Sequence, residues 1–211
     1  MNIISNNCLG GFFYKNNNIQ YTNPFIWSAI LADSMYYLIK NWKNINFNNY
    51  IIEKSEFNNT QNKLDIFKLI IDNNIIAHYT HFHFNSTDNK PRIKGFDVFY
   101  NKIWEYVINK YENRLKRMNE EPIFIILGEY ERNGTNMYDY TFEKEKKILD
   151  IKTNYKIILI TKYKEFLEYN DLNHLIILDK TTRGKIINGI NPNPEYFYEK
   201  HHKEILEFIE K

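Results

Sequence analysis

Apolar residues recur along this chain in two kinds of pattern, which predict a mixture of helices and strands. Between Ile26 and Trp42 they recur every three or four residues, the spacing of an amphipathic helix. The same spacing runs from Phe99 to Met118, where Pro122 ends it, and predicts the longest helix. Further helices are predicted over Thr141 to Ile151, Tyr163 to Asn170 and Glu199 to Ile209.

Three other apolar runs are continuous and short: Ile123 to Leu127, Tyr155 to Thr161, and His174 to Leu178. Continuous runs are typical of strands that are buried on both faces, as in a parallel sheet covered by helices. Because helical segments alternate with these runs, the second half of the chain is predicted to be βαβαβ. We therefore predict one α/β domain over residues 1–211, a three-layer αβα fold with a mostly parallel sheet, and a subdivision near residue 90 stays open.

The first half of the chain is predicted to add a β-hairpin region to this fold. Two β-prone runs, Phe67 to Ile71 and Ile75 to Phe84, flank the turn sequence Asp72-Asn73-Asn74. A short strand is predicted at Tyr50 to Glu53, and the polar segment Lys54 to Lys63 is predicted to be a loop.

The first turn of the chain combines small polar side chains with a pair of glycines. It follows the apolar pair Ile3-Ile4 and predicts a strand, a tight turn and the next element. Glycine allows a ligand to approach the backbone closely, and amides that open a helix can hold a negative oxygen. We therefore predict that substrate is bound by Ser5, Asn6, Asn7, Gly10 and Gly11. The alternative is a plain strand-to-helix connection in which Cys8 is a small buried residue.

Charge and composition exclude several classes of protein. With 28 basic and 26 acidic residues the net charge is only +2, so a nucleic-acid partner is not predicted. The single cysteine excludes an internal disulfide and is typical of a reducing compartment. No apolar run approaches the roughly 18 residues of a membrane span, and no leader pattern is present, so we expect a cytoplasmic protein. No Gly-x-Gly-x-x-Gly or P-loop pattern occurs, and no cofactor is predicted.

Several motifs resemble a bacterial family of uncharacterised exopolysaccharide-biosynthesis proteins. Ser5 to Gly11, followed by Tyr14 and the segment Tyr21 to Phe25, is similar to the S-N-N-C-W-G-G opening of that family, with Leu9 in place of its tryptophan. His78-Tyr79-Thr80-His81-Phe82 resembles its H-F-x-H-Y element. Trp104, Arg114, Arg117 and Asn119 resemble its W-x-R-R-x-x-R-I-N region, with a different spacing between the tryptophan and the arginines. The resemblance implies a function in exopolysaccharide or surface-glycan biosynthesis, on a sugar or other small-molecule substrate and alongside other glycan-assembly enzymes.

A looser similarity joins the chain to a second group, described as papain-like cysteine peptidases. The shared residues are Asn7-Cys8, the element Pro24-Phe25-Ile26-Trp27, and His81. This similarity implies cysteine chemistry.

Cys8 and His81 are the candidate catalytic pair. A cysteine nucleophile needs a base within hydrogen-bond reach and usually a third polar group that orients the base. Glu129 or Glu131, near the end of the Ile123 strand, can supply that third group. An amide of Gly10 or Gly11, or the side chain of Asn7, can hold the oxyanion. The predicted reaction is acyl transfer or hydrolysis, and a buried thiol with a structural histidine is the alternative.

Other histidines are weaker candidates. On a strand only His81 and His83 share a face, while His78 lies opposite, so a zinc or manganese site with Asp88 or Asp97 is not adopted as a prediction. His201 and His202 are predicted to face solvent.

A cationic helix face is the last candidate. Lys110, Arg114 and Arg117 are spaced by four and three residues, so they share one face. Arginine suits phosphate, and this face can hold the diphosphate of a nucleotide sugar. The alternative is a solvated face paired with Glu105, Glu112 or Glu121.

Three functions therefore remain open. The first is a Cys-His enzyme of glycan biosynthesis. The second is a glycan transferase that binds a nucleotide sugar through the Ser5 to Gly11 turn and Arg114 and Arg117. The third is a non-catalytic module that binds carbohydrate or protein through its aromatic surface, since 17% of the residues are aromatic.

Overall fold

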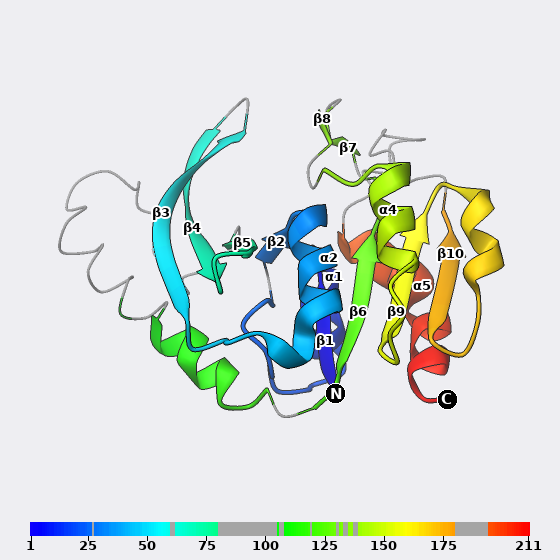
Figure 1. The fold of residues 1–211 in the computed structure, drawn as a ribbon, viewed down its shortest axis with the longest axis horizontal. Helices are drawn as coiled ribbons and strands as arrows, with labels where there is room; N and C mark the ends of the chain where they lie inside the picture. The colour runs from blue at the N-terminus through cyan, green and yellow to red at the C-terminus, as the bar shows by residue number, and fades with distance from the viewer. Residues whose placement is uncertain are drawn as a thin grey trace.

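A parallel sheet of four strands forms the centre of the protein. The computed structural model describes residues 1–26, 28–59, 62–79, 105, 108–118, 120–129, 131–132, 135–136, 139–179 and 194–211. The central strands lie in the order β1 (Asn2–Ser5), β6 (Pro122–Leu127), β9 (Lys156–Thr161) and β10 (His174–Leu178), and each neighbouring pair is parallel (Figure 1). The predicted α/β fold with a parallel sheet is confirmed.

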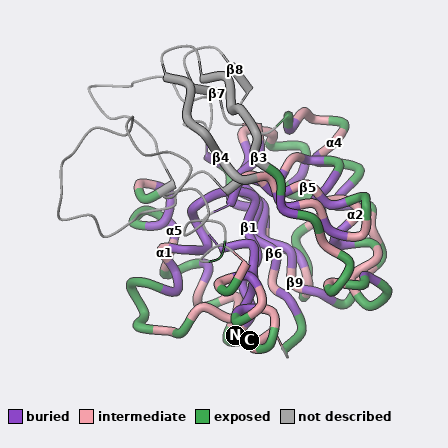
Figure 2. The backbone as a smooth tube through the Cα atoms, turned by 90° about the vertical axis from the view of Figure 1, so that its left-hand side faces the viewer, coloured by how far each residue is buried: buried purple, intermediate pink, exposed green. Residues whose placement is uncertain are grey.

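Helices cover both faces of this sheet. On one face α1 (Leu9–Asn16) and α5 (Pro194–Ile209) pack against Ile3, Ile125 and Ile158. On the other face α2 (Ala32–Asn41), α4 (Phe142–Leu149) and the 3-10 helix η2 (Lys164–Tyr169) pack against Phe124 and Leu159. Because successive strand residues point to opposite faces, continuous apolar runs are what two covered faces require. Figure 2 shows the resulting buried stretches along β1, β6 and β9.

A second, antiparallel sheet lies beside the first. Its strands are β2 (Ser28–Ile30), β5 (Ile75–Tyr79), β4 (Asn62–Ile71) and β3 (Tyr50–Asn59), in that order. The turn between β4 and β5 has positive φ at Asp72 and Asn73, 51° and 57°, which asparagine and aspartate tolerate better than most residues. The predicted hairpin is therefore present. The Ile30 amide donates to the Asn6 carbonyl at 3.1 Å and connects this sheet to the end of β1.

Two sequence predictions in this half are wrong. The helix predicted from Ile26 begins only at Ala32, because residues 28–30 form a strand whose partners, β5 and Asn6, are distant in sequence. Residues 54–59 and 62–63 of the polar segment predicted as a loop belong to β3 and β4, which pair along ten positions from Tyr50 with Ile71 to Asn59 with Asn62. This part of the two strands has no apolar pattern, and hydrogen bonds between the strands stabilise it instead.

The remaining elements are short or partly described. A 3-10 helix, η1 (Trp42–Asn44), follows α2, and β7 (Glu131–Arg132) pairs with β8 (Thr135–Asn136). Of the predicted long helix, residues 105 and 108–115 are described and helical. The closing helix α5 begins at Pro194, five residues before the predicted start, and proline suits the first turn of a helix. Among the helices that are described, none is both long and apolar enough to cross a bilayer.

Side chains from the preceding loop cap the outer edge of β10. The Ile176 amide donates to Asn170 Oδ1 and the His174 amide donates to Asp171 Oδ1, both at 2.7 Å. Backbone donors on an edge strand otherwise need water or another strand as a partner. The two side chains therefore occupy donors that could pair with another strand.

Replacing Asn170 with alanine is expected to lower the free energy of unfolding by about 1 kcal/mol, because the Ile176 amide loses its acceptor. Urea unfolding measures the change. Asn154→Ala is the matched control, since Asn154 is exposed and forms no side-chain hydrogen bond within the described ranges. Equal stabilities for the two variants would contradict the capping role.

Candidate functional site

Strands β1 and β6 are neighbours whose following helices lie on opposite faces of the sheet. Helix α1 follows β1 on the α5 side, whereas α4, the next α-helix after β6, lies on the α2 side. Ligands of open α/β sheets gather outside the carboxyl ends of strands at such a switch point. The carboxyl ends of β1 and β6 are therefore the candidate site.

The side chain of Asn6 closes the gap between these two strands. Its Nδ2 donates to the Leu127 carbonyl at 2.7 Å, and its Oδ1 accepts from the Leu127 amide at 2.9 Å. The amide group thus takes the place of one more β1 peptide in the ladder. As a result, the main chain can leave the sheet after Ser5 while the amide and carbonyl of Leu127 keep hydrogen-bond partners.

The predicted binding turn is held together by its own side chains. Ser5 Oγ donates to the Asn7 carbonyl at 2.5 Å and accepts from the Gly10 amide at 2.9 Å. Asn7 Oδ1 accepts from the Leu9 amide at 2.8 Å. Thus the Gly10 amide, which the sequence suggested as an oxyanion donor, already has an acceptor inside the turn, and so does the neighbouring Leu9 amide. Gly11 is buried on α1, and substrate binding by these residues stays a prediction.

Gly10 has a steric role in this turn. A Cβ atom at that position would lie 2.8 Å from Ser5 Oγ, so a side chain there would push the hydroxyl away from the helix. Glycine therefore allows the close approach that the sequence pattern predicted, with Ser5 rather than a ligand as the neighbour.

Cys8 occupies the position directly before α1. Its backbone conformation is helical, with φ −69° and ψ −6°, and its carbonyl accepts from the Phe12 amide at 3.3 Å. The residue is 7% exposed, whereas Leu9 behind it is fully buried. The proposed partner His81 lies outside the described residues, as do His83, Asp88, Asp97 and Trp104.

Glu129 follows β6 and lies in a charged cluster at the strand ends. Its Oε2 is 2.5 Å from Lys162 Nζ and accepts a hydrogen bond from the Tyr163 hydroxyl. Burial and the Glu129 charge raise the pKa of Tyr163 above its ordinary value. The side chains of Glu129 and Lys162 are 17% and 11% exposed, so the ion pair is largely shielded from water. The structure thus gives Glu129 two defined partners on the segment after β9.

Glu145 contacts the backbone of this cluster from α4, and the sequence analysis did not predict it. Its carboxylate, fully buried on α4, accepts from the Glu129 amide and from Thr161 Oγ1, both at 2.7 Å. A Cβ on Gly128 would lie 2.6 Å from Glu145 Oε1, so glycine makes room for the carboxylate. Burial raises the pKa of Glu145 to about 7. The available signal was its spacing of three from Ile148, which places it on the apolar face of α4.

A buried carboxylate also follows β10. Asp179 Oδ2 lies 2.7 Å from His201 Nε2 and 2.7 Å from Lys200 Nζ, both on α5. His201 is 9% exposed, so the prediction that it faces solvent is wrong. Its spacing of four from the core residues Phe197 and Ile205 is the signal that marked it as buried.

Arg114 lies in the interior rather than on a solvated helix face. It is 3% exposed, its Nη1 donates to the Ile26 carbonyl at 3.2 Å, and its guanidinium lies 5.0 Å from the centre of the Tyr21 ring. Two of the acidic residues suggested as its partners have others: Glu112 accepts from the Tyr50 hydroxyl, and Glu121 pairs with Lys43 at 3.7 Å.

No metal centre emerges from the described ranges, which contain no group of three metal-binding side chains. His78 on β5 is half-buried, and burial together with the charge of Lys68 lowers its pKa.

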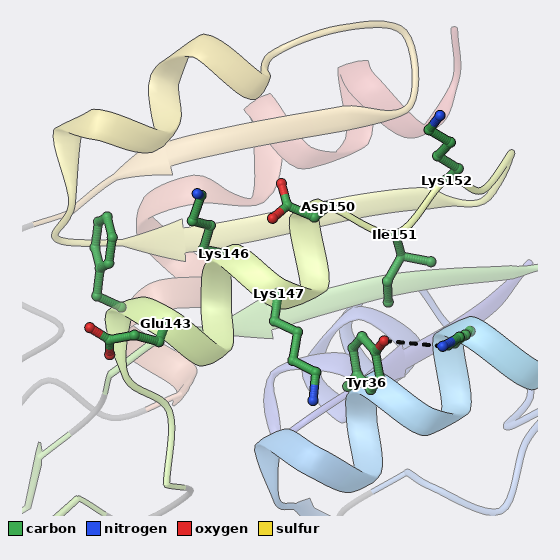
Figure 3. A pocket seen from close by; sticks show the side chains of 9 residues that line it. Tyr36, Glu143, Lys146, Lys147, Asp150, Ile151 and Lys152 are labelled. Carbon is green, nitrogen blue, oxygen red and sulfur yellow. Dashed lines mark hydrogen bonds between the residues drawn. The ribbon is translucent and has the colours of Figure 1, made fainter.

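A separate cavity of about 700 Å³ lies between α2 and α4. Lys147 lies 4.3 Å from the centre of the Tyr36 ring, and Lys40 donates to the Tyr36 hydroxyl at 3.3 Å (Figure 3). Lys40 and Lys147 belong to the last turns of their helices, where cations stabilise the helix dipole. None of the predicted site residues lines this cavity.

Neither a protein-family model nor a curated protein matches the sequence.

Proposed function

We propose that the protein is an enzyme of exopolysaccharide or surface-glycan biosynthesis that uses Cys8 as a nucleophile. The position of Cys8 carries this proposal. It lies directly before α1, in the turn after the carboxyl end of β1, beside the switch point between β1 and β6, where open α/β sheets bind their ligands. The motif resemblance supplies the glycan context.

The reaction proposed is acyl transfer or hydrolysis. His81 accepts the thiol proton while the sulfur of Cys8 forms a bond to the acyl carbon. The bond to the leaving group then breaks, and the leaving group departs with the proton from His81. Water or a sugar hydroxyl next attacks the thioester, which returns the thiol. In this scheme Glu129, held by Lys162 and Tyr163 at the strand ends, orients His81.

A glycan transferase that binds a nucleotide sugar is the second candidate. The burial of Arg114 favours it, because a guanidinium fixed in the interior can present a rigid fork to phosphate. The Ser5 to Gly11 turn favours it less, since the Leu9 and Gly10 amides already donate to side chains of the turn.

The cysteine proposal is tested with p-nitrophenyl acetate as a generic acyl donor. Because the chain has one cysteine, a single acetyl group found there by mass spectrometry identifies the nucleophile. We expect a burst of p-nitrophenolate and acetylated Cys8 in the wild type, no thioester in Cys8→Ala, and a burst slowed by about 10²-fold or more in His81→Ala.

Iodoacetamide labelling at pH 6.5 provides an independent measurement. An activated thiol should react at least about tenfold faster than N-acetylcysteine, whose thiol is almost entirely protonated there. Labelling of Cys8 only after unfolding in urea, together with no acetylation in the native protein, would contradict the proposal.

A further inference from the structure

The buried carboxylate of Glu145 on α4 holds the chain at the ends of two neighbouring strands. Its Oε1 accepts from the Glu129 amide, two residues beyond β6, and its Oε2 accepts from Thr161 Oγ1 at the end of β9, both at 2.7 Å. Thr161 Oγ1 in turn accepts from the Tyr163 amide at 3.2 Å. The segments after β6 and β9 are therefore fastened through a single side chain.

These two segments carry the charged side chains of the candidate site. Glu129 Oε2 comes from the segment after β6, whereas Lys162 Nζ, at 2.5 Å, and the Tyr163 hydroxyl come from the segment after β9. A shift of one segment relative to the other would break both contacts. The position of the Glu129 carboxylate thus depends on the hydrogen bonds that Glu145 makes.

Gly128 shows how closely Glu145 approaches the main chain. A Cβ at position 128 would lie 2.6 Å from Glu145 Oε1 and 2.8 Å from Oε2. The Gly128 amide donates to the Ile160 carbonyl at 2.8 Å, which continues the pairing of β6 with β9 beyond Leu127. Glu145 therefore acts directly beside the last backbone contact between the two strands.

Keeping an acid in this place costs stability. Burial raises the pKa of Glu145 to about 7. A leucine of similar volume would avoid the cost of removing a carboxylate from water. The hydrogen bonds that offset this cost are made to the strand ends of the candidate site, and perturbed acids are concentrated at functional sites.

We propose that Glu145 is a positioning residue of the candidate site, which fixes the Glu129 main chain so that the Glu129 carboxylate meets its partners. The inference rests on the proposed cysteine reaction, in which Glu129 orients His81. Glu145 contacts no reacting atom in that scheme. It should therefore affect the rate of acylation and leave binding of the acyl donor unchanged.

The kinetic test uses p-nitrophenyl acetate with the full chain and two substitutions of Glu145. Glu145→Leu removes both acceptors and keeps a helix-forming side chain, whereas Glu145→Gln keeps one acceptor for the Glu129 amide. We expect Glu145→Leu to lower the maximum acylation rate by about tenfold or more at an unchanged half-saturating concentration. Glu145→Gln should restore most of the rate. Glu143→Leu, at an exposed position of the same helix, is the matched control.

Urea unfolding of the same variants separates positioning from stability. A rate that only follows the stability of each variant would contradict a positioning role. Thr161→Val is a second variant that keeps a β-branched residue in β9, and it removes the hydroxyl that joins Glu145 to the Tyr163 amide. It should slow acylation in the same way, again without a change in half-saturation.

Labelling of Lys162 with acetic anhydride, read by mass spectrometry, tests the same role without Cys8. The side chain of Lys162 is 11% exposed and paired with Glu129, so it should react slowly in the wild type. In Glu145→Leu it should react about tenfold faster, because local opening exposes the amine. Glu143→Leu should react like the wild type.

The two measurements distinguish failure of the positioning role from failure of the cysteine reaction. An absence of acetylated Cys8 in the wild type would contradict the cysteine reaction, and Lys162 labelling would still decide whether Glu145 holds Glu129. Unchanged Lys162 labelling in Glu145→Leu would overturn the positioning role. So would a wild-type acylation rate in that variant, or an equal loss of rate in Glu143→Leu.

Discussion

Replacing Asp179 with alanine is expected to lower the free energy of unfolding by about 3–5 kcal/mol, the largest effect among the substitutions considered for this chain. The Asp179 side chain is 1% exposed and contacts His201 Nε2 and Lys200 Nζ at 2.7 Å each. Without it, the 10% exposed His201 ring keeps a buried nitrogen whose carboxylate partner is gone. The side chain of Lys200 is 41% exposed and can turn to water, so most of the loss comes from His201.

Urea unfolding followed by circular dichroism measures this loss. Asp150→Ala is the control, because Asp150 is exposed and accepts one hydrogen bond, from the Tyr169 hydroxyl at 2.7 Å. It should cost about 1 kcal/mol or less. A similar loss in both variants would show that Asp179 does not fasten α5 to the sheet.

Stability is expected to fall as pH rises through 7, because of Glu145. Burial raises its pKa from an ordinary 4.5 to about 7 in the folded protein. Between these values the folded state holds a proton that the unfolded chain has released, so the protonated form favours folding. The stabilisation is complete below pH 4.5 and is lost as pH rises through 7. Since one pKa unit corresponds to about 1.4 kcal/mol, the loss is roughly 3 kcal/mol.

Glu145→Gln should remove this dependence, because glutamine carries no charge at either pH. We expect the variant to unfold at similar urea concentrations at pH 5 and pH 8, and to match or exceed the wild type at pH 8. Glu143→Gln is the matched control on the same helix, at an exposed position, and should keep the wild-type trend. Parallel pH profiles for wild type and Glu145→Gln would contradict the assignment.

The parallel sheet was predictable because its signal is local. Runs such as Ile123 to Leu127 are apolar at every position, and only strands covered on both faces require that. Strand β2 was not predictable in this way. Its residues 28–30 continue the helical spacing that begins at Ile26, and they are strand because β5 and the Asn6 carbonyl supply hydrogen-bond partners from distant parts of the chain.

The position of the turn from Ser5 to Gly11 was predictable, but the buried charged residues near the strand ends were not. The small residues from Ser5 to Gly11 do lie at the carboxyl end of a central strand, as their pattern indicated. However, Glu145 and Asp179 were missed, since charged residues are seldom buried and each is buried here only because its partners come from other elements. The periodicity of α4 was the signal for Glu145, and that of α5 was the signal for His201, the partner of Asp179.

The pairing of β1 with β6 has a consequence for the order in which this protein folds. Ile3 pairs with Ile123, and the chain between these two residues contains all the strands of the second sheet. The sequence separations between β6 and β9 and between β9 and β10 are much shorter. Closing a long loop costs more chain entropy than closing a short one. We therefore expect β6, β9 and β10 to pair first, and β1, which precedes Cys8 in the chain, to join them last. Assembly of the candidate site thus coincides with the final closure of the sheet.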